Sequence, residues 1–210
     1  SWKSVCAGRS GCDRVMMEVV TGGSGSGKSA YAEQKICGLQ QGTGRLYYIA
    51  TMYPYGSETE RKIEKHRWMR AGKGFRTLEW YTGLSECIEK EFSGQEGAER
   101  LSESSILLEC MSNLVANEMF SGADIISEDV VVGHILQGIK NLSTKVDELV
   151  IVSNNVFEDG ISYDATTQAY IRALGHINTE VAALADTVTE VVVGIPVPVK
   201  ERKEAGYAHH

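Results

Sequence analysis

Short apolar runs alternate with amphipathic or charged stretches along most of the chain, as expected when strands alternate with helices. Five apolar runs predict strands: "MEVVT" (17–21), "RLYYIAT" (45–51), "SSILLEC" (104–110), "DELVIVSN" (147–154) and, as the last strand, "TEVVVGIPV" (189–197). Three other stretches predict helices: "KSAYAEQKICGLQ" (28–40) with a stop at Gly42, "SETERKIEKHRWMR" (57–70) with Ser57 as its cap, and "TTQAYIRALGHINTEVAALAD" (166–186). Because near-continuous apolar strands are covered on both faces, the pattern predicts an α/β fold with a mostly parallel sheet flanked by helices.

The composition is that of one globular domain. The chain has 210 residues, 42% of them hydrophobic and 23% charged, which is enough to form a sizeable core without disulfides or metals. We expect this domain to span residues 16–200. We expect residues 1–15 to be an extension that is disordered or artificial, and residues 201–210 to be a polar tail.

Charge and cysteine content exclude several classes of protein. A formal net charge of -7 argues against a general nucleic-acid binder, and no apolar run is long enough to predict a membrane span. The five cysteines include no C-x-x-C pair, which indicates neither a disulfide framework nor a zinc site. We therefore expect a cytoplasmic protein.

The stretch "VTGGSGSGKSAYAE" (20–33) carries the first evident chemistry. It completes the pattern G-x-x-x-x-G-K-[ST], whose glycine-rich backbone cradles nucleotide phosphates, and it lies between an apolar strand and a helix. We expect Lys28 to reach the β- and γ-phosphates and the Ser29 hydroxyl to help bind Mg²⁺. The alternative is a chance glycine-rich turn.

An acidic residue at the end of a neighbouring strand is expected to complete the magnesium site. Glu109 ends the run "ILLE" at such a place, and Glu79, at the end of "FRTLE" (75–79), is a second candidate. For Glu109 the alternative is a solvated residue at a strand end.

A signalling GTPase is a competing interpretation of the glycine loop. "TKVD" (144–147) imitates the guanine-reading motif of that class, but it precedes "ELVIVSN" instead of following a strand. No D-x-x-G motif follows a strand. "TKVD" is therefore interpreted as a polar entry into a strand.

His66 is the candidate for a second kind of chemistry. It stands in a basic stretch of an otherwise acidic protein, among Arg61, Lys62, Lys65, Arg67 and Arg70. Helical spacing places Lys62, His66 and Arg70 on one face. A neutral imidazole can attack phosphorus while nearby cations neutralise the attacked phosphate. A solvated helix explains the same residues, and the pattern alone leaves both readings open.

An ordered series of motifs resembles one family. The series is "VTGGSGSGKSAYAE", "YIAT", Glu58 followed by "KIEKHRWMR", "RTLE", "LLEC" with Asn117 downstream, "IVSN", "YIRALGHIN" and "VVVGIPVPVK". It is similar to the bifunctional adenosylcobinamide kinase/adenosylcobinamide-phosphate guanylyltransferases of cobalamin synthesis, over roughly residues 17–200. The resemblance implies that the aminopropanol hydroxyl of adenosylcobinamide is phosphorylated. GMP from GTP is then transferred to that phosphate through a guanylylated histidine, which His66 matches.

The resemblance also implies a RecA-like fold, a homotrimer, ATP or GTP as phosphate donor with Mg²⁺, and a set of binding residues. His66 and Lys28 would be catalytic, and Ser29 and Glu109 would hold the metal. The nucleotide would contact the glycine loop, the turn after the second strand, the residues after the histidine and two acids: Gly22, Gly23, Ser24, Gly25, Ser26, Gly27, Lys28, Ser29, Ala50, Thr51, Met52, Arg67, Trp68, Met69, Arg70, Glu79 and Glu109.

The chain departs from the family's usual pattern near its carboxyl-terminal third. Asn155, Val156 and Phe157 follow "SN" where Glu-Val-Gly is usual, and Thr179 follows Asn178 where Gln is common. Two other classes remain open. One is a phosphate-loop kinase of another small molecule, and the other is a GTP-binding switch or interaction module. His134 and His176 are expected to be structural or surface residues.

Overall fold

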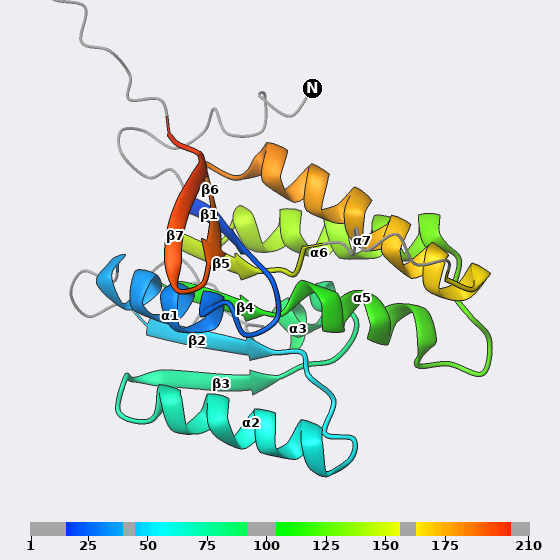
Figure 1. Ribbon diagram of the computed structural model, residues 1–210, viewed down its shortest axis with the longest axis horizontal. Helices are drawn as coiled ribbons and strands as arrows, with labels where there is room; N and C mark the ends of the chain where they lie inside the picture. The colour runs from blue at the N-terminus through cyan, green and yellow to red at the C-terminus, as the bar shows by residue number, and fades with distance from the viewer. Residues whose placement is uncertain (1–15, 40–44, 92–103, 156–162, 203–210) are drawn as a thin grey trace, which may run out of the picture.

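The computed structural model describes residues 16–39, 45–91, 104–155 and 163–202 (Figure 1). Its strands form a seven-stranded sheet in the order β3-β2-β4-β5-β1-β6-β7. The strands are β1 Met16–Thr21, β2 Arg45–Ala50, β3 Phe75–Glu79, β4 Ser104–Glu109, β5 Glu148–Val152, β6 Thr187–Val192 and β7 Ile195–Lys200. Every neighbouring pair is parallel except β6 and β7, which confirms a mostly parallel sheet.

Helices cover both faces of this sheet. They are α1 Lys28–Leu39, α2 Ser57–Arg70, α3 Leu84–Glu91, α5 Met111–Phe120, α6 Glu128–Ser143 and α7 Ala165–Leu184. Alternate strand residues point to opposite faces. Val20 packs with Ile36 of α1 on one face, whereas Val19 belongs to the core under α3, α5, α6 and α7. Two apolar clusters therefore explain why the strands are apolar along their whole length.

The carboxyl ends of five parallel strands meet at one edge of the sheet. β1 runs into the glycine loop at this edge, and β2, β3, β4 and β5 end there in the pairings Ala50 with Glu79, Ala50 with Glu109, and Glu109 with Val152. In open parallel sheets, ligands bind at this edge. The topology thus brings distant candidate residues to one place.

The last predicted strand is in fact a β-hairpin, so its description as one strand is wrong. Val193 and Gly194 have φ values of 45° and 83°, which form the tight left-handed turn that joins two antiparallel strands. Apolar residues on both sides of Gly194 conceal the turn, although the glycine itself is a turn residue. β7 is an edge strand, where Pro196 and Pro198 cost no hydrogen bond within the sheet.

Three further details differ from the sequence-based expectations. Gly56, not Ser57, occupies the cap position of α2, and it makes no side-chain cap hydrogen bond. The pattern analysis also leaves out three helices, α3, α5 and α6. Gly42 and residues 1–15 lie outside the described residues, as do residues 203–210 of the expected tail.

No helix that the structure describes is both long enough and apolar enough to cross a lipid bilayer. The longest, α7, has polar residues along much of its length. Exposed apolar side chains form a surface strip along one edge of the sheet, on the β6–β7 hairpin. They are Val192, Val193, Ile195, Val197 and Val199.

Candidate active site

The glycine loop between β1 and α1 needs glycine for steric reasons. Gly25 and Gly27 have φ values of 72° and 92°, in the left-handed region that side chains disfavour. A Cβ atom on Gly22 would lie 2.6 Å from the carbonyl oxygen of Val191, closer than atoms can approach. The loop is therefore held in a compact shape against the β6–β7 hairpin, with Gly194 donating a hydrogen bond of 2.7 Å to the carbonyl of Ser26.

Lys28 begins α1 and folds back onto this loop. Its Nζ donates a hydrogen bond of 3.0 Å to the carbonyl of Gly23, and the residue is only 9% exposed. Burial lowers the pKa of Lys28, while the nearby Cys110 and Glu109 act in the opposite direction. A cation held this way suits a phosphate chain lying in the loop.

Glu109, at the end of β4, accepts contacts from three side chains. Ser29 Oγ donates a hydrogen bond to Oε1, Tyr48 donates one of 2.9 Å to Oε2, and His66 Nδ1 lies 3.5 Å from Oε1. Burial would raise the pKa of Glu109, but the contact and charge of His66, with the two hydroxyls, more than offset it and lower the pKa. An ionised carboxylate beside the Ser29 hydroxyl is the oxygen donor set that Mg²⁺ prefers.

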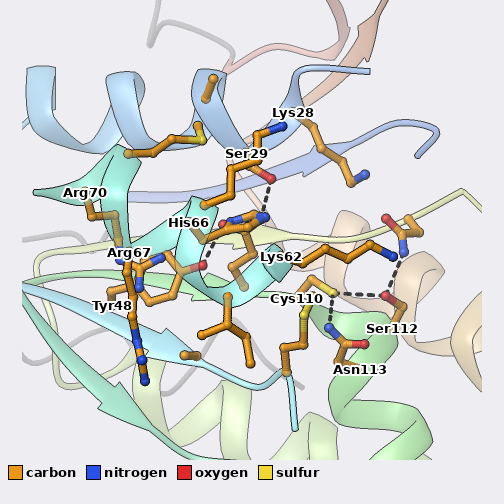
Figure 2. Close-up of a pocket in the computed structure, with 18 of the residues that line it drawn as sticks. Lys28, Ser29, Tyr48, Lys62, His66, Arg67, Arg70, Cys110, Ser112 and Asn113 are labelled. Atoms are coloured by element: carbon orange, nitrogen blue, oxygen red, sulfur yellow. Dashed lines mark hydrogen bonds and ion pairs between the residues drawn. The ribbon is translucent and has the colours of Figure 1, made fainter. Parts of the chain in front are cut away.

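His66 comes to this carboxylate from α2, a helix that runs beside β3 and buries only Arg70 (Figure 1). Lys62, His66 and Arg70, spaced about one helical turn apart, all line one pocket with the glycine loop (Figure 2). Since Nδ1 faces Glu109, Nε2 is the ring nitrogen available for chemistry. The sequence had left open whether His66 was a solvated helix residue, and the structure places it at the phosphate loop instead.

Arg70 is a buried cation at the same end of the pocket. It is 6% exposed, and its guanidinium carbon lies 3.5 Å from the centroid of the Tyr48 ring. Its Nε and Nη1 atoms have no hydrogen-bond partner within the described residues. Arg67, in contrast, pairs with Glu79. Arg70 thus has free, desolvated donors suited to an anion.

The structure adds residues that the sequence analysis missed. Glu33 of α1 is fully buried, and its Oε2 forms an ion pair of 2.7 Å with Lys73 Nζ. Ligand atoms of Glu33, His66 and Glu109 lie within 4.8 Å of one another, close enough to hold a metal ion together. Glu33 follows Ser29 by one helical turn, a spacing that could have revealed it.

The pocket has a volume of about 590 Å³, within the usual range for small-molecule sites. Most of the expected binding residues line it: Ser24, Gly25, Ser26, Gly27, Lys28, Ser29, Ala50, Met52, His66, Arg67, Met69, Arg70, Glu79 and Glu109. Gly22, Gly23, Thr51 and Trp68 are not among the lining residues. Thr51 is buried and forms hydrogen bonds with the backbone of Cys110. Trp68 is 79% exposed, because a residue two positions after His66 points to the opposite side of the helix.

The remaining candidate residues lie away from the pocket. His134 and His176 are exposed on α6 and α7, which confirms them as surface residues. Asn155 donates a hydrogen bond of 2.8 Å to Glu190, and Thr179 donates one of 2.9 Å within α7. Residues 144–147 precede β5, so "TKVD" does not have the position of a guanine-reading motif. Phe157 lies outside the described residues.

Comparisons with known proteins agree with this geometry. Residues 18–199 match the family model described as "Cobinamide kinase / cobinamide phosphate guanyltransferase". The chain is 29% identical over 194 residues to the "Bifunctional adenosylcobalamin biosynthesis protein CobU" of Escherichia coli (strain K12), covering 88% of this chain and all of that protein. It is 29% identical over 197 residues to the protein of the same name from Salmonella typhimurium, with the same shares covered.

A solved structure supports the fold independently. This structure, of an ATPase domain, superposes with a TM-score of 0.56 at 10% identity, over 91% of this chain and 78% of that one. At this identity the likeness concerns architecture alone. It confirms a phosphate-loop fold of the RecA-like kind.

Proposed function

Since this chain belongs to the cobinamide kinase/cobinamide phosphate guanyltransferase family and is therefore a transferase, we propose how its pocket performs two successive reactions. The first phosphorylates adenosylcobinamide. The second transfers GMP from GTP to the adenosylcobinamide phosphate, with His66 carrying the GMP between the two substrates. The product is adenosylcobinamide-GDP.

In the kinase step, the acceptor's hydroxyl oxygen attacks the γ-phosphorus of ATP or GTP. The new oxygen–phosphorus bond forms as the bond to the β-phosphate oxygen breaks, the nucleoside diphosphate leaves, and the hydroxyl proton is released to water. The loop amides and Lys28 stabilise the charge on the phosphates. Ser29 and Glu109 would hold Mg²⁺, which neutralises charge on the β- and γ-phosphates when it is bound.

In the guanylyl step, Nε2 of His66 attacks the α-phosphorus of GTP and pyrophosphate leaves. Glu109 orients the ring by facing Nδ1, so that the proton resides on Nδ1 and the lone pair on Nε2. Arg70 stabilises negative charge on the attacked phosphate. An oxygen of the acceptor's phosphate then attacks the α-phosphorus, the nitrogen–phosphorus bond breaks, and His66 is restored.

One observation carries this proposal. Glu109 contacts both Ser29 of the phosphate loop and His66 of α2, so that the nucleophile and the phosphate loop share one carboxylate. A kinase of another small molecule, or a GTP-binding switch, does not need a histidine at that place.

Supplying adenosylcobinamide with GTP labelled separately on the α- and γ-phosphates tests the proposal. We expect γ-label in adenosylcobinamide phosphate and α-label in a later product that appears with pyrophosphate. A γ-label product without α-label transfer would indicate a kinase alone. Hydrolysis of GTP with neither product would indicate a switch.

The cellular setting and assembly are also part of the proposal. The described cysteines, Cys37, Cys87 and Cys110, are free thiols, which supports a reducing cytoplasm. The exposed apolar strip on the β6–β7 hairpin supports self-association, and the family resemblance favours a homotrimer. Light scattering should then give three times the 23.0 kDa chain mass.

A further inference from the structure

The pocket has two chemically different ends (Figure 2). Figure 2 shows Tyr48, Arg67 and Arg70 at one end, with Cys110, Ser112 and Asn113 at the other. Arg67 and Arg70 mark the first end, His66 lies between the two ends, and Lys28 and Lys62 lie on the side of Cys110 and Ser112. The second end lies where β4 and β5 finish, and its uncharged polar side chains have no role in the mechanism above.

We define the amide cluster as Ser112, Asn113 and Asn154, all of which line the pocket. Asn154 Nδ2 donates a hydrogen bond of 2.7 Å to Ser112 Oγ, and Asn113 Nδ2 lies 3.1 Å from Cys110 Sγ. The Sγ atom in turn lies 3.0 Å from Ser112 Oγ. These contacts fix the orientation of both carboxamides.

This orientation leaves the side-chain oxygens of both Asn residues able to accept hydrogen bonds from a ligand. No hydrogen-bond partner is found for Oδ1 of Asn113 or Asn154 within residues 16–39, 45–91, 104–155 and 163–202. This end of the pocket therefore offers fixed, uncharged hydrogen-bonding groups beside the phosphate loop.

We infer that the amide cluster binds the amide-bearing arm of the acceptor and aims its hydroxyl, and later its phosphate, at the phosphate loop. This inference rests on the proposed function. Phosphoryl transfer requires the attacking and leaving oxygens to lie roughly in line, so the acceptor approaches from a side that the nucleotide does not fill. An Asn carboxamide can both donate to and accept from an amide, and an uncharged cluster does not repel an acceptor phosphate.

Alanine variants of the two amides provide the test. For Asn113→Ala and Asn154→Ala we expect the KM for adenosylcobinamide to rise about tenfold or more, because each loses an amide contact to the acceptor. The KM for GTP should stay within about twofold of wild type, and α-label retention on the enzyme without acceptor should not change. Asn141→Ala, on α6, is the matched control and should leave both constants unchanged.

The conservative variant Asn113→Asp separates binding from folding. Its negative charge should raise the KM for adenosylcobinamide phosphate more than the KM for adenosylcobinamide, which lacks the phosphate. Acceptor KM values that stay at wild type in folded, α-labelled variants would overturn the inference and leave the proposed function standing. Loss of α-labelling with an unchanged acceptor KM would also overturn it. Failure of the wild-type enzyme to modify any corrinoid would overturn the proposed function and, with it, this inference.

Discussion

His66 Nδ1 lies 3.5 Å from Glu109 Oε1, although the two residues belong to a polar helix and to the end of a buried strand. The same carboxylate oxygen accepts a hydrogen bond from Ser29. A change at Glu109 should therefore affect the phosphate loop and the histidine together, which makes this residue the link between the two proposed reactions.

Replacing Glu109 with Gln should slow both reactions. The amide is a poorer ligand for Mg²⁺ and no longer favours the proton on Nδ1 of His66, so we expect kcat to fall by about 10²-fold or more. Rapid-quench measurement of γ-label transfer and of α-label retention checks each step. Glu180→Gln, exposed on α7, is the control. Wild-type rates in Glu109→Gln would rule out both of its roles.

The pH dependence of stability gives an independent test of Glu109. Its pKa is lowered in the folded protein, so its ionised form stabilises the fold above the unfolded value of about 4.3, and this stabilisation is lost as the pH falls further. As the pH falls below ~4.3, the free energy of unfolding of the wild type should therefore decrease relative to that of Glu109→Gln. Urea unfolding across pH 3 to 7 measures it. A difference that is constant over this range would contradict the lowered pKa.

The ion pair between Lys73 and Glu33 should stabilise the fold. Lys73→Met leaves the fully buried Glu33 carboxylate without its cation, which we expect to cost about 3 kcal/mol in the free energy of unfolding. The exposed pair of Lys90 and Glu86 is the comparison, and Lys90→Met should cost less than about 0.5 kcal/mol. Equal losses in the two variants, measured by urea unfolding, would argue against a special role for the buried pair.

Arg70 should discriminate between a guanidinium and a simple cation. Arg70→Lys keeps the charge but loses the planar stack on Tyr48 and the free Nε and Nη1 donors, so we expect the Kd for GTP to rise about tenfold. Isothermal titration with GTP measures this change, and Arg45→Lys, exposed at the start of β2, is the control. Unchanged GTP affinity in Arg70→Lys would remove Arg70 from the nucleotide site.

The sequence was most informative where function depends on local spacing. The loop that ends in Lys28 and Ser29, and the acid at the end of β4, follow from strand–loop–helix order and from parallel strands ending at one edge. The stacking of Arg70 on Tyr48 could not be foreseen, because it depends on how α2 docks beside β3. The turn at Val193 and Gly194 was missed because apolar residues continue on both sides of it, and Gly194 was the one local signal of a change in direction.

The central claim is that His66 carries GMP, and covalent labelling by α-labelled GTP tests it most directly. Wild-type enzyme, denatured after incubation without acceptor, should retain label in a bond that is labile in acid and stable in base, as expected of a phosphoramidate. His66→Ala should retain none, while still transferring γ-phosphate to adenosylcobinamide through the phosphate loop. His134→Ala and His176→Ala, both on the surface, should be labelled like wild type. Label that persists in His66→Ala, or that maps by peptide mass to another residue, would contradict the mechanism.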